Sequence, residues 1–127
     1  MNAAYVMVIL TLLADGQLSA AFVNTESQAR CETRATAVEA ILKKGGADVQ
    51  QIRCVPSALQ FTRFSHDNAG TAPRHAYLLS LGEASLALAP VKNAKACRRQ
   101  RERSAPASGV ERHCVTSTQS LADPSVP

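Results

Sequence analysis

Four cysteines, two in each half of the chain, constrain this sequence more than any other feature. Cys31 and Cys54 lie 23 residues apart, Cys97 and Cys114 lie 17 apart, and there is no C-x-x-C motif. An even number at such wide spacing favours disulfides over a zinc site or a redox pair. Four cysteines allow three pairings. We expect Cys31–Cys54 and Cys97–Cys114, because each bond would join a predicted helix to the strand that follows it.

Two other states of the cysteines stay open in the sequence. Buried thiols are compatible with Cys31 and Cys54, since both occupy positions that face the expected core. A structural zinc site would need C-x₂₋₄-C or H-x₃₋₅-H spacing, which is missing even where His113 adjoins Cys114. None of the four has the surroundings of an activated thiolate. We therefore expect no metal, no cofactor and no catalytic residue.

The opening stretch, MNAAYVMVILTLLADGQLSAAFVN, is compatible with an export signal or with folded structure. Its uncharged run, Ala3–Ala14, is shorter than the roughly 20 apolar residues of a transmembrane helix, so we expect no membrane span. The run has the length of a signal-peptide core, and Ser19-Ala20-Ala21 fits a cleavage site, but MNAA carries no basic residue. Removal of residues 1–21 as a signal peptide stays an alternative interpretation.

Asp15-Gly16 indicates instead that residues 5–23 form a β-hairpin. The dipeptide suits a two-residue turn in which both residues have positive φ, and apolar residues flank it on both sides. Folding about this turn would pair Ile9 with Phe22. The first strand of the hairpin is apolar on both faces, so it should lie in the centre of a sheet that is covered on both sides.

A helix is predicted over residues 25–44. Thr25 and Gln28 fit the capping box S/T-x-x-E/Q, and Gly45-Gly46 supplies a C-terminal stop. Helical spacing also places four apolar side chains on one face, which should pack on the sheet: Cys31, Ala35, Val38 and Leu42.

A strand is predicted next, over Val49–Val55. Its more apolar face contains Ile52 and Cys54. A helix that folds back on this strand would bring Cys31 next to Cys54, which is why we expect this pair to form a bond.

The second half of the sequence follows the same order. Ala76-Tyr77-Leu78-Leu79 echoes Ala4-Tyr5-Val6-Met7, and a Cys-Val pair at 114–115 echoes the one at 54–55. Between them lie an apolar strand, LALAPV, and a helix that carries Cys97 and that Asn93 is suited to cap. We interpret these echoes as an internal repeat, which predicts the second disulfide by analogy with the first.

The predicted fold is α+β and disulfide-stabilised, with two tandem β-β-α-β units that share one mainly antiparallel sheet. The first unit covers residues 1–60, and the second, shorter unit covers residues 75–118. Residues 61–74 contain Asn, Gly and Pro and are predicted to form a connecting loop. Residues 119–127 are predicted to form a flexible C-terminal tail.

Positive charge is concentrated in residues 92–112. Residues 1–91 hold seven basic and seven acidic side chains, residues 92–112 hold seven basic and two acidic, and the whole chain carries +4. An electrostatic partner should bind at this segment. A solvated helix face with an Arg98–Glu102 pair is the plainer interpretation. The residues we predict to form a partner-binding basic patch are Lys95, Arg98, Arg99, Arg101 and Arg103.

No catalytic, metal-binding or phosphate-binding motif is present, the three histidines (66, 75 and 113) are scattered, and no small-molecule site is identifiable. We expect a small non-enzymatic protein, secreted or periplasmic, that binds a protein partner or serves as an accessory subunit of a larger assembly. A partner that binds at the basic segment would be acidic. One alternative is a thiol-dependent enzyme or an enzyme accessory protein. Others are a cytoplasmic protein with free thiols, and a module that binds nucleic acid or lipid through residues 92–112. No aromatic residues interleave the arginines, which disfavours single-stranded nucleic acid.

Overall fold

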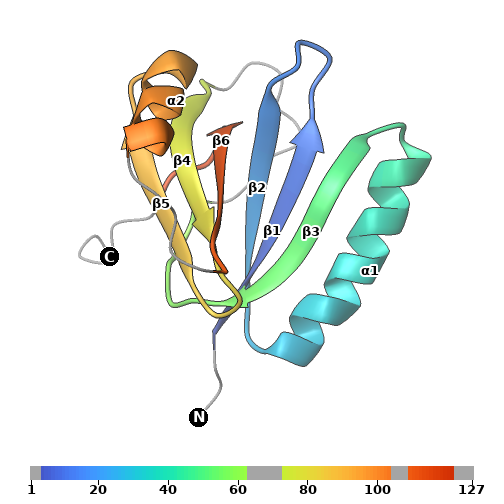
Figure 1. Ribbon diagram of the computed structural model, residues 1–127. Coiled ribbons are helices and arrows are strands. Elements are labelled where there is room, and N and C mark those ends of the chain that lie inside the picture. The colour runs from blue at the N-terminus through green and yellow to red at the C-terminus, as the bar shows by residue number, and fades with distance from the viewer. Residues whose placement is uncertain (1–3, 63–72, 104–108, 122–127) are drawn as a thin grey trace.

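The computed structural model describes residues 4–62, 73–103 and 109–121, and it is α+β as predicted. The strands and helices follow one another along the chain in the order of two β-β-α-β units (Figure 1). The first unit contains β1 (Tyr5–Leu12), β2 (Leu18–Thr25), α1 (Gln28–Lys44) and β3 (Asp48–Pro56). The second unit contains β4 (His75–Leu81), β5 (Leu86–Val91), α2 (Ala94–Arg103) and β6 (Glu111–Ser117).

All six strands belong to one mixed sheet with the order β3-β1-β2-β6-β4-β5. Each unit contributes three neighbouring strands with its first strand in the middle, and the pairing inside both units is antiparallel. The units join where β2 and β6 run parallel, with Ser19 opposite Thr116. The predicted fold class is therefore confirmed. The predicted loop at 61–74 lies mostly outside the described residues, as does the tail beyond Leu121.

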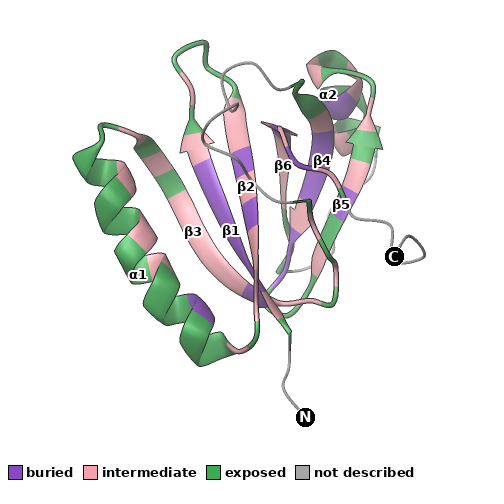
Figure 2. Cartoon of the chain, turned by 180° about the vertical axis from the view of Figure 1, so that it is seen from behind, coloured by how far each residue is buried: buried purple, intermediate pink, exposed green. Residues whose placement is uncertain are grey.

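The sheet curves so that its inner faces in the two units build one core. Val6, Val8 and Leu10 of β1 belong to the same buried cluster as the inner side chains of β4, which are Tyr77, Leu79 and Leu81. Figure 2 shows the buried parts of β1, β2 and β4 near the middle of the sheet. The units thus share a core and are not separate globules.

The outer face of the sheet carries both helices. α1 packs on Met7 and Ile9 of β1 through the predicted stripe, Cys31, Ala35, Val38 and Leu42. β1 is consequently covered on both faces, as its apolar sequence predicted, and its residues 6–10 are all buried.

The predicted register of the first hairpin is wrong by one residue. β1 and β2 pair with Val8 opposite Phe22 and Ile9 opposite Ala21. The turn is longer than a two-residue turn, because the Gly16 N–H donates to Leu13 O and only Gly16, not Asp15, has positive φ. A type I turn followed by a left-handed glycine adds one residue to the loop and shifts the register.

The first helix begins later than the sequence predicted. Ser27 is the N-cap, and its Oγ accepts a hydrogen bond from the Arg30 N–H, so Thr25 does not form the expected capping box. The end is as predicted: Gly45-Gly46 follows the last turn, and the Ala47 N–H donates to Leu42 O. With Gly46 at φ +86, this bond completes a Schellman motif.

The structure does not align the two sequence echoes that suggested a repeat. Tyr5 lies on the outer face with α1, whereas Tyr77 lies in the inner core. Judged by partners in the ladder, Val6 corresponds to Tyr77, since Val6 pairs with Val55 and Tyr77 pairs with Val115. The order of elements matches in the two units, but the AYVM and AYLL stretches are out of step by one residue.

Both predicted disulfides are present, Cys31–Cys54 and Cys97–Cys114. Cys31 and Cys97 are each the fourth residue of their helix, and the N–H of each donates to the carbonyl of the N-cap, Ser27 or Asn93. Asn93 Oδ1 also accepts from the Ala96 N–H, as its predicted capping role requires. The two bonds therefore fasten the first turn of each helix to the last strand of its own unit.

Gln119 closes the inner face where β6 leaves the sheet. The Phe22 N–H donates to Gln119 Oε1 at 2.8 Å, and Gln119 Nε2 donates to Phe22 O and Thr62 O. Tyr77 Oη donates to Gln119 O, and burial raises the pKa of this hydroxyl. Only 1% of Gln119 is exposed, although the sequence placed it in the tail. Its side-chain amide supplies β2 with the pairing that a strand backbone would otherwise give.

The two disulfides should contribute differently to local order. Cys97 is the only buried residue of α2, while α1 also packs through its apolar stripe. Replacing Cys97 and Cys114 by Ala should lower the free energy of unfolding by roughly 3 kcal/mol in the chain-entropy model and expose the amides of α2 to exchange. The matched Cys31→Ala, Cys54→Ala variant should keep α1 protected. Hydrogen exchange distinguishes the two, and loss of α1 protection before α2 protection would contradict this prediction.

Gln119→Ala should destabilise the fold through the polar groups that it leaves buried. The Phe22 N–H would lose its acceptor, and each unsatisfied buried group costs about 1–3 kcal/mol. Gln60→Ala is the control, because Gln60 is exposed and an exposed substitution usually changes stability by less than about 0.5 kcal/mol. Urea unfolding of both variants is the measurement. Equal urea midpoints for the two variants would show that the hydrogen bonds of the Gln119 side chain do not stabilise the fold.

Candidate partner-binding surface

The predicted basic patch lies on α2. Lys95, Arg98, Arg99 and Arg103 are exposed, and Arg101 is half-buried beside the sheet. The helix presents these side chains because Cys97 is its only buried residue, so most of its surface faces solvent. Arg101 and Arg103 lie in the last turn, where positive charge interacts favourably with the helix dipole.

The charges of this patch are not neutralised within the part of the chain that the structure describes. The expected Arg98–Glu102 ion pair is not formed, and no described carboxylate lies within 4.0 Å of Lys95, Arg98, Arg99, Arg101 or Arg103. An Arg placed before Glu at i,i+4 is the weaker orientation of such a pair, which agrees with its absence. Arg112, in the same basic segment, has another role: its Nη2 donates to Arg101 O at 2.8 Å and holds the end of α2.

A small hollow of about 210 Å³ lies beside the basic helix. Arg98 and Arg101 form its charged side, Gln17 comes from the first hairpin, and Thr116 comes from β6. The hollow is thus built from both units, next to the parallel junction of β2 and β6.

A second hollow, of about 340 Å³, lies on the outer face between α1 and the first hairpin. Ile41 stands at its edge with 69% of its surface exposed. This hollow was not predicted from the sequence, because Ile41 lies outside the apolar stripe of its helix. Its other apolar lining residues are Ile9, Leu13, Ala21, Val23, Val38, Leu42 and Ala47.

An open hollow of about 580 Å³ surrounds the start of α1. Its lining includes Glu26 and Arg30, which lie 3.7 Å apart in an exposed ion pair. Arg34 also lines the hollow and has no described carboxylate within 4.0 Å, so the lining carries a net positive charge.

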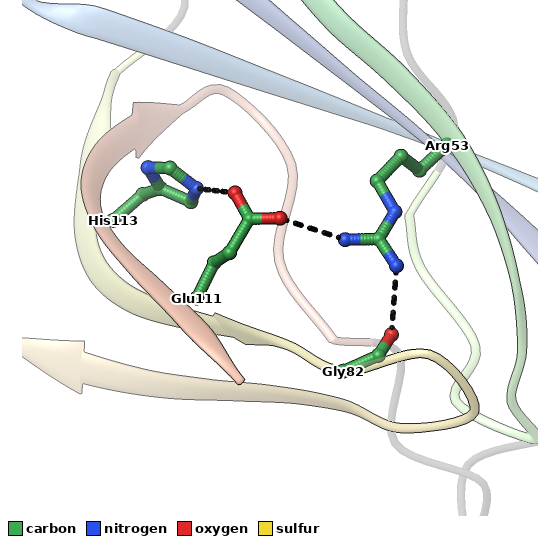
Figure 3. Close-up of polar contacts among 4 residues, drawn as sticks. All are labelled: Arg53, Gly82, Glu111 and His113. Atoms are coloured by element: carbon green, nitrogen blue, oxygen red, sulfur yellow. Dashed lines mark hydrogen bonds and ion pairs between the residues drawn. The ribbon is translucent and has the colours of Figure 1, made fainter. Parts of the chain in front are cut away.

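A cluster of polar side chains connects β3 of the first unit with β6 and with Gly82, after β4, of the second unit (Figure 3). Arg53 of β3 donates from Nη1 to Glu111 Oε2 and from Nη2 to Gly82 O, both at 3.1 Å. His113 Nε2 lies 3.3 Å from Glu111 Oε1. The Arg53–Glu111 pair links the last strand of each unit, and both of its partners are partly exposed. We assign the cluster a structural role, since its polar atoms bind one another.

The remaining sites considered in the sequence give no further centre. Of the three histidines, His75 begins β4, His113 belongs to the cluster with Arg53, and His66 lies outside the described residues. Within residues 4–62, 73–103 and 109–121, no group of three or more His, Cys, Asp or Glu side chains is arranged to hold a metal ion. The described helices are all too short or too polar to cross a membrane.

Comparison with known proteins adds no relative. No protein-family model matches the chain, and no curated protein or solved structure matches it significantly.

Proposed function

We propose that this chain is a small non-enzymatic protein that binds an acidic protein partner through the basic patch on α2. The observation that carries this proposal is that five cationic side chains on one ten-residue helix have no described carboxylate within 4.0 Å, although Glu102 belongs to the same helix. Like charges on neighbouring turns repel one another. An acidic surface would remove this repulsion on binding and would steer association.

The way α2 is attached supports the same role. The helix adds one buried side chain to the core, so it contributes little to stability by packing. Its position is instead fixed by the Cys97–Cys114 disulfide and by the Asn93 cap. A surface helix held covalently at its first turn can present a set of arginines in a fixed arrangement, which lowers the entropy lost on binding.

The disulfides also bear on where the protein acts. Two disulfides are consistent with an oxidising, extracellular compartment. We propose a secreted or periplasmic protein that serves as an accessory subunit of a larger assembly. A thiol-dependent enzyme is the alternative that the cysteines disfavour, because each would have to leave its disulfide before it could react.

Nucleic acid and anionic lipid are the other partners that positive charge could attract. Base stacking usually requires aromatic side chains. α2, with the sequence AKACRRQRER, contains none. The chain therefore fits an acidic protein surface better than single-stranded nucleic acid, and anionic vesicles are included as a competitor in the test below.

Charge reversal on α2 should weaken partner binding selectively. We expect Arg98→Glu, Arg99→Glu to raise the Kd for a partner recovered by mild copurification by at least about tenfold, or 1.4 kcal/mol, and to flatten its salt dependence. The control is Arg34→Glu, Lys44→Glu on α1, which makes the same change in net charge at two exposed residues. It should change the Kd by less than about threefold, or roughly 0.6 kcal/mol.

Both variants should keep their thermal stability, because exposed charges typically contribute less than about 1 kcal/mol. Equal weakening by the two pairs would reduce the effect to net charge, and unchanged binding in the α2 variant would refute the proposal. Competition by anionic vesicles as strong as by the partner would point to lipid instead.

A further inference from the structure

We propose that the acidic partner binds as one amphipathic segment laid across the outer face of the sheet, with apolar side chains beside Ile41 and carboxylates on Arg98 and Arg101. The inference rests on the proposed function and specifies what kind of partner segment the surface fits. It follows from where the two hollows lie relative to each other.

The two hollows open on the same face of the sheet. Ala21 and Val23 of β2 point toward α1, and Ser19, two residues before Ala21, points the same way. Ser19 is paired with Thr116 of β6, so the two side chains share one face, and Cys114 of the same strand is bonded to α2. α1 and α2 therefore stand on either side of one continuous strip of sheet.

The hollows meet at the junction of β2 and β6. Ser19 lines the apolar hollow, and Thr116 lines the basic one. Arg74 spans the junction: its Nη2 donates to Ser19 Oγ at 2.7 Å and its Nε to Thr116 Oγ1 at 3.1 Å. Its Nη1 makes no hydrogen bond to any described residue. An exposed guanidinium with donors to spare thus stands between the apolar and the basic hollow.

The distance suits a short segment. The strip runs from β1 through β2 and β6 to β4, which is three strand spacings or roughly 14 Å at about 4.8 Å each. An extended segment of about five residues, or a helix of about ten, would cover it. Apolar side chains at one end and Asp or Glu at the other would match the lining in order.

Charge decides which occupant fits. A second copy of this chain would bring another +4 and would place arginines against arginines if the helices faced each other. A purely apolar segment would leave Arg74, Arg98 and Arg101 beside it without counter-charges. A segment that is both apolar and acidic satisfies both hollows.

A random twelve-residue peptide library selected on the disulfide-bonded protein tests the inference. We expect enriched sequences to combine apolar residues with Asp or Glu three to eight positions away. Isotope-labelled protein titrated with the most enriched peptide should show shifted amides in both Ser19–Val23 and α2. Peptides that are only acidic or only apolar, shifts confined to α2, or no enrichment over the Arg98→Glu, Arg99→Glu variant would overturn it.

Protein variants separate this inference from the proposed function. Ile41→Ser should weaken the selected peptide at least tenfold, because burying an isoleucine stabilises a complex by about that factor or more. Leu121→Ser is the control. Leu121 is also an exposed apolar residue, but it pairs with Phe61, which packs against the inner core. It should change the affinity less than twofold. If Ile41→Ser leaves binding of the copurified partner intact while reversal on α2 abolishes it, the proposed function stands and the segment across the sheet does not.

Discussion

The inner faces of the two units pack into a single core, and the other features of the structure depend on that contact. A three-stranded unit of about 50 residues could not bury enough apolar surface to be stable alone. Curving one six-stranded sheet lets β1 of the first unit and β4 of the second cover each other's inner faces. Phe22 extends this core by stacking on Phe61, with ring centroids 4.2 Å apart. Few aromatic residues are therefore needed to fill this shared core.

With the inner face closed in this way, the helices only have to cover the outer face, and they do so unequally. α1 spans 17 residues and packs through a stripe, whereas α2 spans ten and buries one cysteine. Much of the outer face of the second unit needs less cover, because Ala76, Ser80 and Ala89 there are small. Leu78, on the same face, is large and buried. This asymmetry leaves α2 available to carry charge, and no described helix covers the strip of sheet between α1 and α2.

Most features encoded by neighbouring residues were predicted from the sequence, although the capping box expected at Thr25 is not formed. The Gly45-Gly46 stop, the Asn93 cap and the two disulfides each depend on one helix or on one helix and its next strand. The hairpin was predicted correctly but its register was not, because a turn that contains one more residue moves every pair by one. The basic patch was located on a helix by its composition alone.

Features that join distant parts of the chain had no signal in the sequence. Gln119 binds Phe22 across 97 residues, and Arg74 meets Ser19 across 55. Both contacts depend on β2 and β6 becoming neighbours, which neither strand's own sequence specifies. The exposure of Ile41 likewise follows from how α1 lies on the hairpin.

The placement of the disulfides has a consequence for covalent connectivity. Each bond closes a loop inside one unit, and neither crosses from one unit to the other. The peptide chain between residues 56 and 75 is thus the sole covalent link between the halves. A single cut there would leave two chains that separate under denaturing conditions without any reductant, although in native buffer the shared core would still hold them together. The two disulfides therefore stabilise each unit separately, and the units associate through non-covalent contacts and one peptide segment.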